Sequence, residues 1–127
     1  MIVLTLPYPI SVNAMYRNRL KGRAKSERYR TWLNAVGWEI KAQRQQPIKG
    51  SYTLRITLYE ADNRRRDPGN MEKCISDALV EAGLIEDDSL CVSMEIARCK
   101  TAGKARCGVV VFPSNGIPVE EGLSNVA

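Results

Sequence analysis

Residues 64–88 read RRRDPGNMEKCISDALVEAGLIEDD, and this stretch says most about the fold and the function of the chain. Asp67 and Pro68 are typical of a helix start, as N-cap and first helical position. Gly83 is typical of a helix stop. The stretch therefore predicts a helix from Pro68 to Ala82. Its predicted buried stripe comprises Met71, Cys74, Ile75, Ala78, Leu79 and Ala82.

Charged side chains gather at both ends of this predicted helix. Arg64, Arg65 and Arg66 run directly into Asp67, and Asp88 follows the helix end. Arginines attract a phosphodiester backbone, and carboxylates can hold a divalent metal ion against it. Each residue taken alone is more simply a helix cap or a solvated side chain. The combination indicates a site that holds a phosphodiester and a metal ion together.

The apolar residues on either side of this stretch predict the other elements. Apolar–polar alternation predicts strands at 2–6, 52–58 and 92–96, and an apolar run predicts a central strand at 108–112. Helical spacing predicts a helix that Ser26 caps and that runs to about Gln45. Residues 11–25 lack this periodicity and are predicted to form a basic loop. Residues 114–127 show no pattern, and we expect a mobile tail.

The predicted order is β-α-β-α-β-β, in a chain of 127 residues. This order indicates one α+β domain over residues 1–113, with a mixed four-stranded sheet and two helices. No stretch reaches the ~18 apolar residues that a membrane helix needs. The N-terminus lacks the features of a signal peptide. We therefore expect a cytoplasmic protein with no membrane partner.

The composition excludes several kinds of catalytic site. Histidine is absent, which excludes Ser-His-Asp catalysis, Cys-His catalysis and histidine-ligated zinc. The four cysteines form no Cys-x-x-Cys pair, which argues against a structural zinc site. We expect them to be buried free thiols in a reducing cytoplasm.

The net charge of +5 is concentrated in three segments. Residues 17–30 contain seven basic residues and one acidic residue, Glu27. Arg64 to Arg66 form the second cluster. The third consists of Arg98, Lys100, Lys104 and Arg106. A charged run is often only a solvated surface, but three separate clusters favour a polyanionic partner.

The central stretch resembles the core signature of the RusA family of Holliday junction resolvases, small endonucleases of bacteria and prophages. That signature looks like Arg-Arg-Arg-Asp-x-Asp-Asn-x-x-Lys, then Asp-Ala-Leu within a helix, then Ala-Gly-x-x-x-Asp-Asp. The matching segments are Arg64–Lys73, Ser76–Leu79 and Ala82–Asp88. The opening Leu6-Pro7-Tyr8-Pro9, followed by Ser11, Asn13 and Tyr16, also fits, and the resemblance reaches to about Pro113.

The resemblance implies a Mg²⁺-dependent homodimer that nicks two strands of a four-way DNA junction symmetrically. The family's carboxylates fall on Asp67 and Asp88, as metal ligands and catalytic residues, and its essential lysine falls on Lys73. Lys73 would stabilise charge on the phosphoryl group, or would simply pair with Asp77. The family's second aspartate falls on Gly69, which has no ligand side chain. The nearest possible substitute ligands are Asn70, Asp77 and Asp87.

The basic residues of two segments are expected to contact DNA phosphates without reading sequence. These residues are Arg17, Arg19, Lys21, Arg23, Lys25, Arg64, Arg65 and Arg66. Tyr16 would stack on bases or wedge between them, or would pack in the core or on the surface instead. Exposed N–H groups near Gly69 would suit a phosphate oxygen, or would only form a tight turn. Gly69 also supports a second hypothesis, a non-cleaving structure-specific nucleic-acid-binding module. A third is a nuclease for RNA or other branched DNA.

Overall fold

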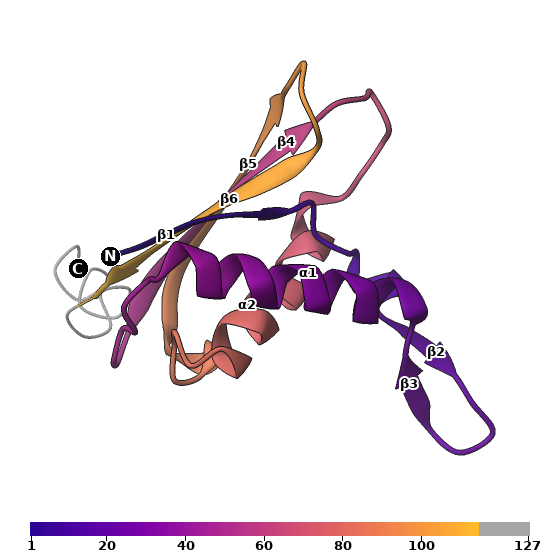
Figure 1. Ribbon diagram of the computed structural model, residues 1–127, viewed down its shortest axis with the longest axis horizontal. Helices are drawn as coiled ribbons and strands as arrows, with labels where there is room; N and C mark the ends of the chain where they lie inside the picture. Colours follow the sequence, from indigo (N-terminus) through magenta and orange to yellow (C-terminus); the bar gives the residue numbers. More distant parts are fainter. Residues whose placement is uncertain (115–127) are drawn as a thin grey trace, which may run out of the picture.

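A mixed four-stranded sheet carries two α-helices on one face (Figure 1). The computed structural model describes residues 1–114, so the predicted tail lies outside the described residues except for Ser114. The sheet order is β1 (Ile2–Pro7), β6 (Arg106–Pro113), β4 (Tyr52–Glu60) and β5 (Cys91–Lys100). The helices are α1 (Glu27–Gln43) and α2 (Glu72–Glu81). The predicted α+β architecture is confirmed.

Strand β4 shows why the sheet has one buried face. Its Leu54, Ile56 and Leu58 are fully buried, while Arg55 between them is exposed. β4 pairs parallel with β5 and antiparallel with β6, and β6 also pairs antiparallel with β1. The predicted central strand at 108–112 is therefore confirmed as part of β6. The fully buried side chains along one face of β4 place the hydrophobic core between the sheet and the helices.

Helix α1 begins where the sequence indicates and ends slightly early. The Ser26 hydroxyl accepts a hydrogen bond from the Tyr29 N–H at 3.1 Å, so Ser26 is the N-cap. The buried stripe is Tyr29, Trp32, Val36 and Ile40. The helix ends at Gln43, because Arg44 takes a left-handed conformation with φ of 48°.

The loop predicted for residues 11–25 is wrong. This segment contains a short 3₁₀ turn, η1 (Val12–Ala14), and an antiparallel hairpin of β2 (Tyr16–Asn18) and β3 (Arg23–Lys25). The hairpin extends away from the domain (Figure 1). The segment has no apolar alternation because it has no buried face of its own. Gly22, at φ of 78°, instead permits the turn, and the Tyr16 ring packs edge-on against Tyr29.

The second helix starts later than predicted. Pro68–Met71 forms a 3₁₀ turn, η2, and α2 proper begins at Glu72. Gly69 and Asn70 are weak helix formers, and the Asp67 carboxylate caps the Gly69 N–H at 3.0 Å, which favours the tighter turn. Ala82 is exposed rather than buried, and Ser76, predicted off the stripe, is buried instead with its hydroxyl bonded to Glu72.

The cysteines are only partly as predicted. All four are free thiols, and Cys74 and Cys107 are buried. Cys91 is half-buried and Cys99 is exposed, since both belong to β5, most of whose side chains are exposed. β5 extends beyond the predicted 92–96, and its Met94 is exposed. Within residues 1–114, no helix is long and apolar enough to cross a membrane.

Candidate active site

The chain turns back after α2 and brings Asp88 beside the first turn of that helix. Gly83, at φ of 76°, closes α2, with the Leu84 N–H bonded to the Leu79 carbonyl at 3.0 Å. The return segment ends at η3 (Asp88–Leu90), where the Asp88 carboxylate lies 3.5 Å from the Lys73 ammonium. Asp88 is therefore near the start of α2, although α2 separates it from Asp67 in sequence.

Lys73 lies between two carboxylates. Its Nζ is 2.9 Å from Oδ1 of Asp77, so the predicted i,i+4 pair is confirmed, and the same Nζ reaches Asp88. The hydrogen bond to Asp77 raises the pKa of Lys73, partial burial lowers it, and the charges of Asp77 and Asp88 raise it further, with a net increase. Lys73 is therefore protonated at neutral pH, and it suits stabilisation of negative charge better than proton transfer.

Asp67 caps the turn that leads into α2. Its Oδ1 accepts the Gly69 N–H at 3.0 Å, and its backbone carbonyl accepts the Asn70 N–H at 3.0 Å. The Gly69 N–H is therefore directed at Asp67, which favours the tight-turn interpretation of this glycine. The approach of Asp67 to Asp88 around a metal ion stays a prediction.

The donor atoms near α2 fit one manner of binding Mg²⁺. Within residues 1–114, no three Cys, Asp or Glu side chains are grouped as a ready-made metal site. Asp67 and Asp88 are both exposed. Mg²⁺ is often held by one or two carboxylates, with water and phosphate oxygens as its other ligands, and this pair fits that manner of binding.

Two of the three possible substitute ligands, Asp77 and Asp87, have local roles. Asp77 pairs with Lys73. Asp87 caps η3 by accepting the Ser89 N–H at 2.8 Å. Asn70 is half-buried in η2.

An open hollow lies beside Asp88 and connects it to the hairpin. Its volume is about 370 Å³. One wall comes from the base of the hairpin and α1, and the other from α2 and the return segment. The lining residues are Tyr16, Lys25, Tyr29, Asp77, Val80, Glu81, Asp87 and Asp88. Tyr16 is half-buried, with Arg23 4.9 Å above its ring, which favours the packing role left open for it.

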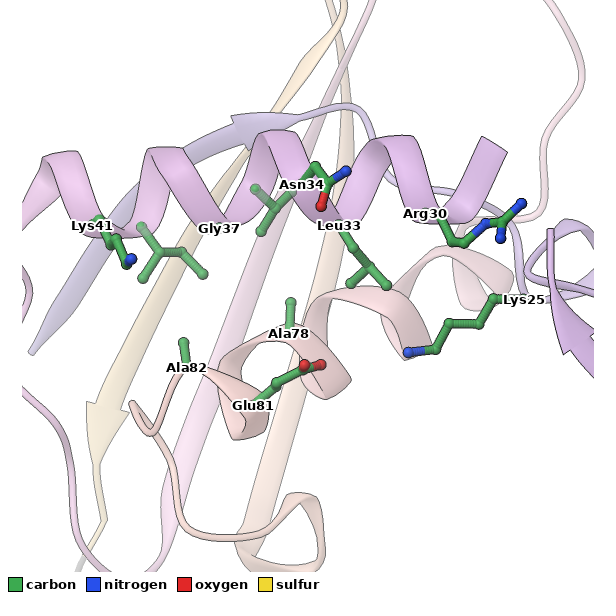
Figure 2. Close-up of a pocket in the computed structure, with 11 residues that line it drawn as sticks. Lys25, Arg30, Leu33, Asn34, Gly37, Lys41, Ala78, Glu81 and Ala82 are labelled. Carbon is green, nitrogen blue, oxygen red and sulfur yellow. The ribbon is translucent and has the colours of Figure 1, made fainter. Parts of the chain in front are cut away.

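A second hollow, of about 590 Å³, lies between α1 and α2 (Figure 2). Its floor is largely apolar, from Leu33, Val36 and Ile40 on α1 and Ala78 on α2. It contains none of the predicted catalytic residues, although it adjoins the hollow beside Asp88 and shares Lys25 and Glu81 with it.

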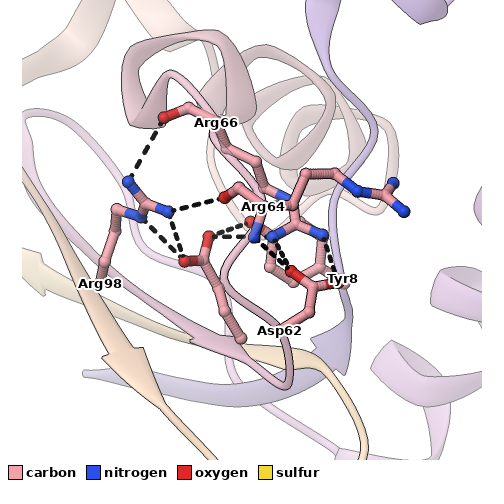
Figure 3. Close-up of polar contacts among 6 residues, drawn as sticks. Tyr8, Asp62, Arg64, Arg66 and Arg98 are labelled. Carbon is pink, nitrogen blue, oxygen red and sulfur yellow. Dashed lines mark hydrogen bonds and ion pairs between the residues drawn. The ribbon is translucent and has the colours of Figure 1, made fainter.

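Sequence reasoning missed a buried charged network that holds the arginine segment (Figure 3). Glu60, at the end of β4, is only 5% exposed. Its carboxylate accepts hydrogen bonds from the Tyr8 hydroxyl at 2.6 Å and from Nε of Arg98 at 2.9 Å, and it forms an ion pair with Nη2 of Arg98 at 2.7 Å. Burial raises the pKa of Glu60, but the bonds from Arg98 and Tyr8 outweigh it, so the pKa is lowered. Glu60 is therefore a buried anion that its neighbours satisfy.

Arg98 also fixes the backbone just before Asp67. It donates to the carbonyl oxygens of Arg64 and Arg66, each at 3.4 Å. Arg66 is itself bonded to Asp62 at 2.8 Å and is only 16% exposed, whereas Arg64 and Arg65 are exposed. Arg66 therefore stabilises the segment, whereas the exposed side chains of Arg64 and Arg65 are accessible to a phosphate. Glu60 could have indicated this network, because it is a charged residue at a position where the alternation of β4 places buried side chains.

Similarity to known proteins identifies the class of enzyme. The family model that matches residues 7–111 describes endodeoxyribonucleases, enzymes that cut DNA within the strand. The chain belongs to the RusA endodeoxyribonuclease family. It is 33% identical over 104 residues to a crossover junction endodeoxyribonuclease of Enterobacteria phage 82, which covers 75% of this chain and 80% of that protein. Proteins of the same name from Shigella sonnei and Escherichia coli K12 are 31% identical with the same coverage.

Proposed function

We propose that this chain is a Mg²⁺-dependent endonuclease that resolves four-way DNA junctions by paired phosphodiester hydrolysis, in recombination and repair. The observation that carries the proposal is the contact of Lys73 with Asp77 and Asp88, in the first turn of the helix that follows the turn capped by Asp67. The family and the names of the relatives, crossover junction endodeoxyribonucleases, support this substrate. They also favour a cleaving enzyme over the non-cleaving binding module.

Asp67 and Asp88 would hold the Mg²⁺ ion. When bound, that ion would polarise the scissile phosphate and lower the pKa of a bound water. Lys73, held by Asp77 and protonated at neutral pH, stabilises the negative charge that develops on the phosphoryl group. Gly69 removes one family ligand, and the two remaining carboxylates suffice for a mostly hydrated Mg²⁺.

Arg64 and Arg65 bind backbone phosphates near Asp67, because both side chains are exposed and lie three and two residues before it in the sequence. The five basic residues of the hairpin, Arg17 to Lys25, bind phosphates on the opposite side of the hollow. Two symmetric cuts require two copies of the site, so the functional unit is a homodimer. The protein acts in the cytoplasm of a bacterium, from a chromosomal or prophage gene.

Cleavage of synthetic DNA tests the proposal. The protein is incubated with a four-way junction, its component duplex and a single strand, over a series of Mg²⁺ concentrations. Paired nicks near the branch, absent in EDTA, are expected for the junction only. Equal cleavage of all three DNAs would overturn the junction specificity, and tight junction binding without cleavage would support the binding module. Cleavage of an RNA strand would support the third hypothesis.

A further inference from the structure

The most exposed large hydrophobic side chain within residues 1–114 is Leu20, at the tip of the β2–β3 hairpin. Its relative exposure is 106%, which means that it contacts nothing in its own chain. The turn itself is made by the Arg19 N–H bonded to the Gly22 carbonyl at 2.9 Å and by Gly22 at a positive φ. A polar residue would serve in this turn equally well. The leucine therefore points to a contact outside the chain.

The hairpin is firmly attached at its base. Met15, just before β2, is fully buried, and its carbonyl accepts the Ser26 N–H at 2.9 Å. Ser26 also donates its hydroxyl to the Ala14 carbonyl at 2.7 Å, and it caps α1. The Tyr16 ring lies between Arg23 and Tyr29. These contacts fix both ends of the hairpin to the core and to α1, so the tip is carried on a supported arm.

The charge around Leu20 indicates the chemistry of its partner. Arg19 and Lys21 flank it, and residues 16–25 contain five basic and no acidic residues. A matching partner has anions on its outside and apolar surfaces within reach of a leucine. Nucleic acid has this arrangement, because phosphates surround stacked bases, and leucine is among the residues that wedge between base steps.

The position of the arm relates Leu20 to the candidate active site. Tyr16 and Lys25, at the base of the arm, line the same hollow as Asp88. Leu20 lies four positions beyond Tyr16, so the tip is up to about 13 Å from the base of the arm. That span alone corresponds to about four nucleotides at 3.4 Å each, and the width of the hollow between Tyr16 and Asp88 adds to it. DNA cut beside Asp88 would therefore reach the tip a few nucleotides away from the cut.

We propose that Leu20 inserts between bases of branched DNA four or more nucleotides from the cleaved phosphate, while the flanking basic residues bind the backbone. This inference rests on the proposed function. The insertion separates bases that are already weakly stacked at a branch, where unstacking costs least. It would favour a branched over a continuous duplex without reading sequence.

Fluorescence of 2-aminopurine tests the insertion, because this base brightens when it is unstacked. The probe is placed at successive positions from the branch of a four-way junction, in EDTA, so that no strand is cut. Wild-type protein is expected to give a several-fold rise at one or two positions that lie four or more nucleotides from the cut. Leu20→Ala is expected to lose that rise. Trp38→Ala is the matched control, since Trp38 is a 74% exposed apolar residue on α1, and it should retain the rise.

The salt dependence of binding separates insertion from charge. Leu20→Ala removes no charge, so the slope of log affinity against log salt should stay as in the wild type. Lys21→Ala should lower that slope by about 1. Circular dichroism should show unchanged folding for Leu20→Ala, because the side chain has no contact to lose.

An equal fluorescence rise for wild type and Leu20→Ala would overturn the insertion. A change of oligomeric state for Leu20→Ala in light scattering would overturn it too, since the tip would then contact a second copy. Binding to phosphatidylglycerol–phosphatidylcholine vesicles that depends on Leu20, with no dependence on DNA, would assign the tip to a membrane surface. The proposed function is tested separately, by cleavage of the junction with wild-type protein. If the wild type cleaves the junction but the fluorescence rise does not depend on Leu20, only the insertion is overturned.

Discussion

The guanidinium of Arg98 contacts Oε1 of the Glu60 carboxylate in two ways: Nε donates a hydrogen bond at 2.9 Å, and Nη2 forms an ion pair at 2.7 Å. Glu60 ends β4 and Arg98 lies on the parallel neighbour β5, so the pair spans two strands. The same guanidinium reaches the backbone on both sides of Arg65. The pair therefore connects the sheet to the segment that presents Asp67.

Arg98→Met should destabilise the fold and reduce cleavage. It leaves the Glu60 carboxylate buried with only Tyr8 and the more distant Arg66 as partners. We expect a loss of about 1–2 kcal/mol in urea unfolding, less than for a fully buried pair, because Arg98 is itself 38% exposed. Arg55→Met is the control, since it breaks an exposed pair with Glu95 on the same two strands. Equal stability of both variants would contradict the bracing role.

The Glu60 carboxylate should make stability depend on acid pH. Its pKa is lowered in the folded state, so its contribution is fully present above the unfolded value near 4.5 and is lost as pH falls through the lowered folded pKa. Glu60→Gln should be less stable than the wild type at pH 7, and its stability should fall less between pH 5 and pH 3. Urea unfolding at a series of pH values measures both. Parallel curves for the two proteins would refute the assignment.

Asp67→Asn should abolish cleavage and leave junction binding intact or tighter. The substitution removes one negative charge that faces the phosphate, which favours binding. Asparagine caps helix starts as well as aspartate, so stability should change by less than about 0.5 kcal/mol. Gel-shift affinity and cleavage rate are compared on the same junction. Equal loss of binding and cutting would indicate a folding role for Asp67 instead.

Lys73→Met should slow cleavage by about 10²-fold or more, the usual effect of removing one preorganised charge-stabilising donor. Asp77→Asn is the informative companion, because it removes the closest partner of Lys73 and leaves the ammonium in place. Its cleavage rate should fall much less than that of Lys73→Met. If both variants lose cleavage equally, the pair rather than the ammonium is what the reaction needs. Single-turnover cleavage rates decide.

Gly69→Asp should raise Mg²⁺-dependent cleavage by restoring the family's second aspartate. Gly69 does not have a positive φ, so the backbone accepts a side chain without strain. A Cβ there would lie 3.3 Å from Oδ1 of Asp67, a contact that needs only a small shift. Gly69→Asn, with the same shape and no charge, is the control. Normal binding with no faster cutting at any Mg²⁺ concentration would show that the missing carboxylate does not limit the enzyme.

The elements with a regular apolar pattern could be predicted, and those without one could not. Alternation located β1 and β4, an apolar run located β6, and helical spacing located α1, each to within a few residues. The hairpin was missed because its residues have no buried face, and what holds it is Tyr16 on Tyr29, a contact between segments. The late start of α2 was missed because the choice between a 3₁₀ and an α turn depends on the cap geometry of Asp67.

The candidate site was predictable where it is local. The Lys73–Asp77 pair follows from i,i+4 spacing. The approach of Asp88 to the helix start was expected from the family resemblance, which puts Asp67 and Asp88 in one site and so requires the chain to turn back after Gly83. The partner of Glu60 is 38 residues away on a parallel strand, and strand register is not written in either segment alone. The bracing role of Arg66 could not be predicted either, because three consecutive arginines look alike in sequence.

Helix α2 also sets how far this region tolerates insertions and deletions. Adding or removing one residue between Lys73 and Gly83 would rotate the helix end by about 100° and shift it by about 1.5 Å relative to Lys73. The return segment would then leave α2 in another direction, and Asp88 would no longer meet the lysine. The ten residues of α2 thus act as a spacer of fixed length, and relatives that keep this geometry should vary here by substitution and not by length.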